Sequence, residues 1–184
     1  MVIIGISGVN VKENDESHWD NLEIALKEQL PHAKFVVERE LNCRPYSFSR
    51  LRQLAYRIAL KHDTGEEIVL LGKSAGGIVA LIVASLLKNS RVLLIATLFA
   101  PHQFPLWGAY RWLLGAPRDP GVPIITFQMV GDRLVWWGAR HPLSKSHVVL
   151  RSNVRHAHKY ALVNDLELAR VVARHVKEAL FPSA

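Results

Sequence analysis

The serine at position 74 stands where residue types and spacing predict a chemical reaction. Glycines at positions 72 and 76 flank it, which gives the pattern Gly-x-Ser-x-Gly. An apolar run at 68–71 precedes this pattern, and a second one begins at Ile78. The order predicts a strand, a sharp turn and a helix, with the serine hydroxyl raised above the end of a sheet as a nucleophile. The alternative is that Ser74 only caps the helix.

The same stretch contains Gly72-Lys73-Ser74, which is how a phosphate-binding loop ends. Such a loop requires a further glycine five residues before Gly72 and a glycine-rich segment between the strand and the lysine. Position 67 is glutamate, and the apolar run leads directly into Gly72. The pattern therefore argues against a nucleotide-binding loop.

A serine hydroxyl needs a positioned base, which is usually an imidazole oriented by a carboxylate. Asp132 and His158 each follow a predicted strand. The chain order Ser74, Asp132, His158 predicts a catalytic triad at one edge of a parallel sheet. Each partner has a simpler interpretation, because Asp132 could be a turn residue and His158 could lie in a solvated basic loop. His156 is the alternative base.

Apolar runs without alternation predict strands that are buried on both faces, and apolar residues at helical spacing predict the helices between them. The predicted strands span 2–6, 34–38, 67–72, 91–98, 122–129 and 147–150. The predicted helices run from Ser17 to Pro31, from Ser47 or Ser49 to His62, from 76 to 88, from 106 to 114, and from a cap formed by Asn164 with Glu167 to Leu180. This alternation predicts one α/β domain, residues 1–184, as a three-layer α/β/α sandwich with a mostly parallel sheet of about six strands.

The stretch 99–120 interrupts the alternation, because it combines aromatic residues with four prolines. One interpretation is a surface loop that packs its own aromatic side chains, and the other is a short lid over an apolar substrate cleft. In the second case Phe99, Phe104 and Trp107 would contact the substrate. The tryptophans at 136–137 either line an apolar part of the site or belong to the core.

Lys and Arg outnumber Asp and Glu by 23 to 16, which gives a net charge of +7. This balance favours attraction to polyanions, anionic membrane surfaces or acidic substrates. The basic residues are spread along the chain and form no nucleic-acid-binding motif, so dedicated nucleic-acid binding is not predicted.

The single cysteine, Cys43, excludes an internal disulfide and a cysteine-based metal set. The first residues show no basic segment followed by a long apolar one, and no apolar run reaches the roughly 18 residues of a membrane span. We therefore expect a soluble, cytoplasmic protein without a signal peptide or membrane span.

These motifs resemble those of a small α/β-hydrolase. The chain is similar in particular to the compact, nearly lidless serine hydrolases of the retinoblastoma-binding-protein-9 type. The likeness covers almost the whole chain: the opening strand and turn, His18-Trp19, the Gly-x-Ser-x-Gly-Gly motif, the Gly-Asp-x-x-Val turn at 131–135, and a histidine ahead of an apolar helix. The resemblance implies an α/β-hydrolase fold with a minimal cap.

The resemblance also implies an oxyanion hole formed by the backbone N–H groups of Ala75 and Val9. Two positions depart from the family pattern. Lys73 stands where the family often has an uncharged residue, and it either packs or draws an anionic substrate group towards the site. Ser7-Gly8 replaces the frequent His-Gly ahead of Val9.

The chemistry that these residues predict is hydrolysis of a small carboxylic ester with an apolar part. Ser74 would attack the carbonyl to form an acyl-enzyme, His158 would take and return the proton, and Asp132 would hold the imidazole tautomer. No metal or organic cofactor is implied. A thioesterase or small amidase would use the same residues, and a non-catalytic binding or scaffold protein would keep the same fold.

Overall fold

The computed structural model describes residues 1–7, 19–39, 47–103, 107–130, 132, 138–151 and 162–182. The strands in this part of the chain form one sheet in the order β2-β1-β3-β4-β5-β6, and all neighbours are parallel. Their bounds are β1 (Val2–Ile6), β2 (Lys34–Glu38), β3 (Glu67–Lys73), β4 (Arg91–Leu98), β5 (Ile124–Met129) and β6 (Ser146–Leu150). The prediction of a mostly parallel sheet of about six strands is confirmed.

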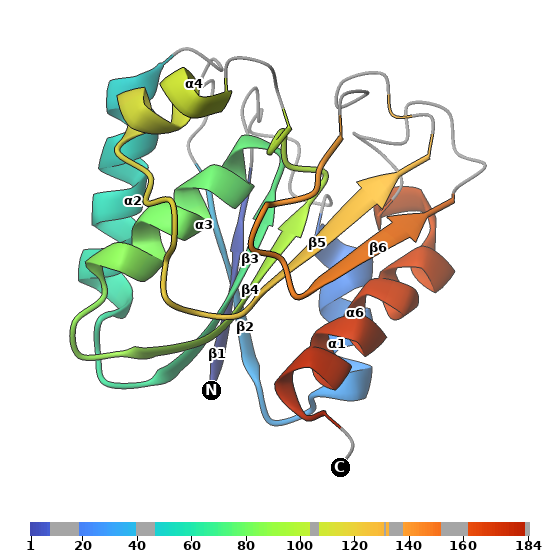
Figure 1. The fold of residues 1–184 in the computed structure, drawn as a ribbon. Helices are drawn as coiled ribbons and strands as arrows, with labels where there is room; N and C mark the ends of the chain where they lie inside the picture. The colour runs from blue at the N-terminus through green and yellow to red at the C-terminus, as the bar shows by residue number, and fades with distance from the viewer. Residues whose placement is uncertain are drawn as a thin grey trace.

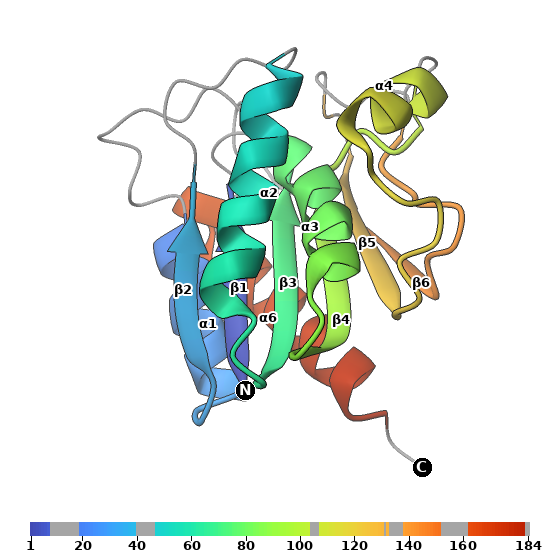
Figure 2. The same cartoon turned by 90° about the vertical axis from the view of Figure 1, so that its left-hand side faces the viewer.

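Helices cover both faces of this sheet (Figure 1). One layer contains α1 (Asp20–Gln29) and α6 (Leu166–Leu180), and the other contains α2 (Phe48–His62), α3 (Ala75–Leu86) and α4 (Trp107–Leu114). Figure 2 shows the second layer from outside, with α2 and α3 in front of the sheet. The predicted three-layer sandwich is therefore confirmed. None of the helices in the described part of the chain is long and apolar enough to cross a membrane.

Two apolar clusters join the layers, because successive strand residues point to opposite faces of the sheet. Along β3, Val69 and Leu71 pack under α1 and α6, whereas Ile68 and Leu70 pack under α2 and α3. Helix α3 is buried without interruption over 75–83. This continuous burial confirms the central, covered position that its apolar composition predicts.

Several element ends differ from the sequence prediction by one or a few residues, and two of the differences have a clear physical reason. The fifth strand begins at Ile124, after Pro123, because proline has no N–H for a strand ladder. The cap of the closing helix is Asp165, not Asn164: the Asp165 carboxylate accepts a hydrogen bond from the N–H of Leu168 at 2.9 Å. Asn164 instead ends a short helical turn before the cap. A carboxylate at this position also interacts favourably with the positive end of the helix dipole.

The sheet order places the topological switch point between β1 and β3. The chain leaves β1 towards β2 on one side and continues from β3 towards β4 on the other, so the connections after β1 and β3 diverge. Ligands of open α/β sheets bind at such switch points, at the carboxyl ends of the strands. Ser7 follows β1 and Ser74 follows β3, so both residues stand at this edge. The predicted start of the first helix, Ser17, lies outside the described residues.

Candidate active site

Ser74 lies in a strained turn between β3 and α3. Its backbone has φ 55° and ψ −127°, a combination that residues other than glycine rarely adopt. The N–H of Ser74 donates to the carbonyl of Leu98 at 2.8 Å, and its own carbonyl accepts from the N–H of Gly77 at 3.0 Å. Ser74 is the N-cap residue of α3 by position, but its side chain makes no capping hydrogen bond. Such strain costs about 1–3 kcal/mol and concentrates at functional sites.

The glycines around Ser74 are required by close packing. A Cβ on Gly76 would lie 2.2 Å from the carbonyl oxygen of Ile6, and a Cβ on Gly72 would lie 2.4 Å from that of Gly76. Neither glycine has a positive φ, so the left-handed residue of the turn is the serine itself. The first turn of α3 therefore packs directly on the end of β1, and no side chain fits between them.

The end of β1 is anchored from two sides. The indole N–H of the buried Trp19 donates to the Ser7 hydroxyl at 2.9 Å, and its ring packs against Phe35 with the centroids 6.1 Å apart. The N–H of Ser7 donates to the carbonyl of Glu38 at 3.0 Å. Because Gly76 touches this same chain end, the anchoring of Ser7 also positions the start of α3.

Ala75 is the first residue of α3, so its N–H lies at the positive end of a helix of 12 residues. The N–H groups of a first helical turn have no carbonyl partner within the helix, and the helix dipole favours negative charge there. This position suits a donor to an oxyanion that forms on Ser74. Val9, the second predicted donor, lies outside the described residues.

Asp132 follows β5 at the same edge of the sheet. It is buried, and its N–H donates to the carbonyl of Met129 at 3.3 Å. Only β4 separates β5 from β3, so Asp132 and Ser74 follow strands that are two places apart. His158 and His156, the predicted base and its alternative, lie outside the described residues. The structure thus places two of the three predicted triad residues at one edge.

The predicted substrate contacts occupy different positions. Lys73 ends β3 and is 8% exposed, and strand alternation puts it on the α1 and α6 side together with Leu71. Phe99 is fully buried in the cluster on that side. In this conformation its side chain packs in the core and exposes no surface that a substrate could contact. Trp107 begins α4. The Trp107 side chain, Phe104 and the tryptophans at 136–137 lie outside the described part.

A buried polar cluster beside α3 is absent from the sequence prediction. His102 Nε2 lies 3.0 Å from Thr97 Oγ1, and the ring of His102 meets that of His141 edge to face, with the centroids 5.0 Å apart. A Cβ on Gly77 would lie 3.2 Å from the Cβ of Thr97, so the cluster adjoins the first turn of α3. The sequence shows only two separate histidines beside prolines, with no spacing that relates them.

Burial holds both imidazoles neutral. Burial, and secondarily the charge of His141, lower the pKa of His102 to about 3. The pKa of His141 is also lowered, by burial and then by the charge of Arg111, against the opposite effect of Asp119. The N–H of Leu143 donates to His141 Nδ1 at 3.2 Å, so a neutral His141 carries its proton on Nε2.

Several solved structures have a similar arrangement of strands and helices, and their names describe esterases or hydrolases. The esterase domain of a protein from Rhodothermus marinus has a TM-score of 0.58 and 19% identity, over 96% of this chain and 84% of that one. A lipase-esterase related protein from Clostridium acetobutylicum has a TM-score of 0.60 and 14% identity, over 96% and 93%. An extracellular α/β-hydrolase from a Paenibacillus species has a TM-score of 0.62 and 13% identity, over 97% and 98%. The chain has the α/β-hydrolase fold.

The α/β-hydrolase fold confirms the prediction at the level of architecture. No protein-family profile and no curated protein sequence matches the chain, so the likeness lies in the structure. The narrower resemblance to the retinoblastoma-binding-protein-9 type stays a prediction. Ser74 lies in the turn between the central strand β3 and the helix α3 that follows it.

Acid is expected to destabilise this protein through His102. The pKa of the folded imidazole is about 3, against 6.5 for the ordinary group, so below pH 6.5 the unfolded chain binds a proton that the folded protein does not. Stability is therefore complete above pH 6.5 and is lost as the pH falls towards 3. Between about pH 7 and about pH 5 the loss is about 2 kcal/mol for His102 alone. Urea unfolding at several pH values measures it.

The matched control for this prediction is His32, which is exposed. His102→Gln keeps a hydrogen-bonding group for Thr97 but removes the titration, so the free energy of unfolding should fall less steeply with acid. His32→Gln, measured in parallel, shows the effect of replacing one histidine at the surface. An unaltered pH dependence in His102→Gln would contradict the assignment of a low pKa to this histidine.

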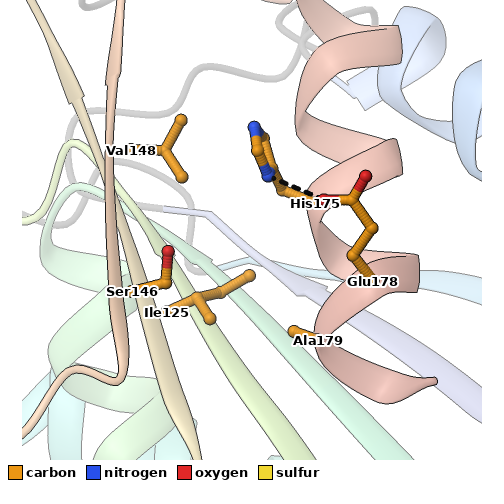
Figure 3. Close-up of a pocket in the computed structure, with 6 residues that line it drawn as sticks. All are labelled: Ile125, Ser146, Val148, His175, Glu178 and Ala179. Carbon is orange, nitrogen blue, oxygen red and sulfur yellow. Dashed lines mark ion pairs between the residues drawn. The ribbon is translucent and has the colours of Figure 1, made fainter. Parts of the chain in front are cut away.

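A cavity of ≈ 220 Å³ lies between α6 and the strands β5 and β6 (Figure 3). His175 projects from α6 into this space, and its Nδ1 pairs with Glu178 Oε2 at 3.1 Å. Ile125 and Ser146 line the cavity near the amino ends of their strands, so the cavity lies at the end of the sheet opposite to Ser74. The described residues contain no group of three or more His, Cys, Asp or Glu that could hold a metal ion.

Proposed function

We propose that this α/β-hydrolase is a serine hydrolase that cleaves carboxylic esters. The observation that carries the proposal is the backbone of Ser74, which is held in a strained conformation at the carboxyl end of a central strand. A serine that only connects a strand to a helix has no need of this strain, whereas a nucleophile needs it to stand clear of the sheet. Esterases and hydrolases among the structural neighbours support hydrolytic chemistry.

In the proposed reaction, Ser74 Oγ attacks the ester carbonyl while His158 takes its proton. The N–H groups of Ala75 and Val9 donate to the oxyanion, and Asp132 accepts from the protonated imidazole. When the carbonyl reforms, the bond to the leaving alkoxide breaks, and His158 returns the proton to it. Water then attacks the acyl-serine by the same route, which releases the carboxylic acid and restores Ser74.

The proposed substrate is a small ester with an apolar portion. Phe104 and Trp107 belong to the connection that leaves β4 beside Ser74, and we assign the apolar portion of the substrate to this segment. Lys73 stands directly before the nucleophile, but its side chain is buried on the α1 and α6 side, so we assign it a packing role and expect no preference for anionic esters.

Hydrolysis of p-nitrophenyl esters of increasing acyl length tests the proposal. The wild-type protein is expected to hydrolyse them, with kcat/KM rising about fourfold for each methylene that the pocket buries. His158→Ala should lower kcat/KM at least about 10³-fold, because no other group would accept the serine proton. His156→Ala is the matched control, since it removes an imidazole two residues away, and it should retain activity.

The outcomes distinguish the alternatives. Loss of activity in His156→Ala but not in His158→Ala would transfer the role of base to His156. Cleavage of thioesters or amides in place of oxygen esters would replace the proposed substrate class while keeping the triad. A folded protein that hydrolyses none of these compounds would contradict the enzymatic proposal.

A further inference from the structure

The solvent side of α2 carries an apolar stripe of exposed side chains. Tyr56 and Leu60 are 59% and 87% exposed. They are four residues apart and therefore lie on the same side of the helix, one turn from each other. The residues that α2 buries, such as Leu54 and Ile58, face the sheet. The stripe is thus separate from the core face of the helix.

Helix α4, in the same layer, also carries exposed apolar side chains. Trp112 is 78% exposed and Leu113 is 39% exposed. The two helices contact each other, and Leu114 of α4 joins the buried cluster that contains Leu51 of α2. Both helices belong to the layer that faces the reader in Figure 2. We define the α2–α4 face as the exposed residues Arg52, Tyr56, Arg57, Leu60, Trp112 and Leu113.

The charge of the α2–α4 face is positive. Helix α2 contains three arginines, one lysine and no acidic residue, and α4 contains one arginine and no acidic residue. Arg52 and Arg57 lie on either side of the apolar stripe at helical spacing. Arg57 also donates to the carbonyl of Arg39 at 3.2 Å. Lys61 is paired with Glu38 at 2.7 Å and is not part of the face.

We propose that the α2–α4 face docks on an anionic lipid bilayer. Exposed leucine and aromatic side chains between cations are the composition of helices that lie in a membrane interface. Trp112 and Tyr56 would stand at the level of the headgroups, Leu60 and Leu113 would reach the acyl boundary, and the arginines would pair with anionic headgroups.

Other polyanions and a second copy of the chain fit this face less well. A nucleic acid would use the arginines but would offer no apolar environment to Leu60, which is the most exposed of these side chains. Two copies of the face would repel each other, because neither helix carries an acidic residue. A bilayer satisfies both the charge and the apolar surface.

Docking by this face does not require a reactive Ser74. Helix α4 follows β4, and Leu98 at the end of β4 accepts the hydrogen bond from the N–H of Ser74. Helix α4 and the start of α2 therefore lie towards the carboxyl edge of the sheet, whereas Leu60, near the end of α2, lies towards the amino edge.

Sedimentation with vesicles tests the proposal. We expect the full chain to bind vesicles of phosphatidylcholine with about 30% phosphatidylserine at least about tenfold more tightly than vesicles of phosphatidylcholine alone. Raising the salt from about 0.05 M to about 0.5 M should weaken binding, because the headgroup contacts are screened. Emission of Trp112 should shift to shorter wavelength on binding, and Trp112→Phe should remove this shift.

Matched variants on the two helical layers distinguish vesicle binding through this face from a general attraction of the basic protein to anionic vesicles. The pair Arg52→Gln and Arg57→Gln, and the pair Leu60→Ala and Trp112→Ala, should each weaken vesicle binding at least about tenfold. Arg174→Gln and Phe181→Ala are the controls, because both residues are exposed at α6 on the opposite layer and Phe181 is as exposed as Tyr56. These controls should bind like the wild-type protein.

Three results would overturn the proposal. One is absence of binding to the anionic vesicles at low salt by a folded protein. The second is an equal loss of binding in the control variants, which would show a diffuse effect of the net charge. The third is equally tight binding to an RNA homopolymer with no effect of Leu60→Ala and Trp112→Ala, which would make the face a nucleic-acid surface.

Discussion

Ser74→Ala is expected to lower kcat/KM for a p-nitrophenyl ester at least about 10⁴-fold while the protein stays folded. The reason is that alanine removes the only atom that can form the acyl-enzyme, whereas the hydrogen bonds that hold the turn come from the backbone of residue 74. Steady-state hydrolysis and urea unfolding of the same preparations measure the two effects. A variant with more than about a tenth of the wild-type kcat/KM would contradict the role of Ser74 as nucleophile.

Ser74→Gly is a second variant, and it tests whether the backbone of residue 74 is strained. Glycine adopts positive φ without steric cost, so this variant should be about 1 kcal/mol more stable than Ser74→Ala and equally inactive. The same urea experiment compares the two variants. If Ser74→Gly were about 1 kcal/mol less stable than Ser74→Ala, which is the entropic cost of glycine alone, the turn at φ 55° would not be strained, and the observation that carries the proposed function would be lost.

Gly76→Ala is expected to destabilise the protein by about 3 kcal/mol or more and to impair hydrolysis with it. The added Cβ would lie 2.2 Å from the carbonyl oxygen of Ile6 and 2.8 Å from that of Ser7. Both are backbone atoms of the end of β1, which cannot rotate away, so α3 and with it Ser74 must move. The urea midpoint and kcat/KM of the variant measure the two consequences.

The neighbouring glycine gives the control for this steric argument. A Cβ on Gly77 would lie 2.7 Å from the Cβ of Ala100, which is a side-chain atom. Gly77→Ala should therefore be destabilised, and Ala100→Gly in the same chain should restore part of the loss. No second substitution of this kind is open to Gly76. If Gly76→Ala were as stable as the wild-type protein, the close contact of α3 with β1 would be wrong.

The order of the elements around Ser74 is predictable from sequence because it depends on local patterns. Apolar runs without alternation mark the buried strands, and the small residues at 72 and 76 mark a close approach of strand and helix. The left-handed conformation of Ser74 is not predictable in this way, because it is maintained by the carbonyl of Leu98 on the next strand. Phe99, which follows Leu98 in the chain, also has a positive φ.

Long-range contacts explain what the sequence does not indicate. His102 and His141 come from separate connections, and only the folded chain brings their rings together. At the closing helix, Asn164 and Asp165 are both good caps by residue type, and the short helical turn before Asp165 decides between them. Lys73 has two interpretations in the sequence, and strand alternation together with burial places it on the α1 and α6 side.

Covalent labelling of Ser74 by a fluorophosphonate tests the central proposal most directly. The phosphorus atom reacts with an activated serine and releases fluoride, so the label requires a nucleophile and a base but no particular ester substrate. We predict one label per folded chain, located by mass spectrometry on the peptide that contains Ser74 and absent from Ser74→Ala. A folded wild-type protein that remains unlabelled, or that is labelled equally in Ser74→Ala, would contradict the assignment of Ser74 as the nucleophile.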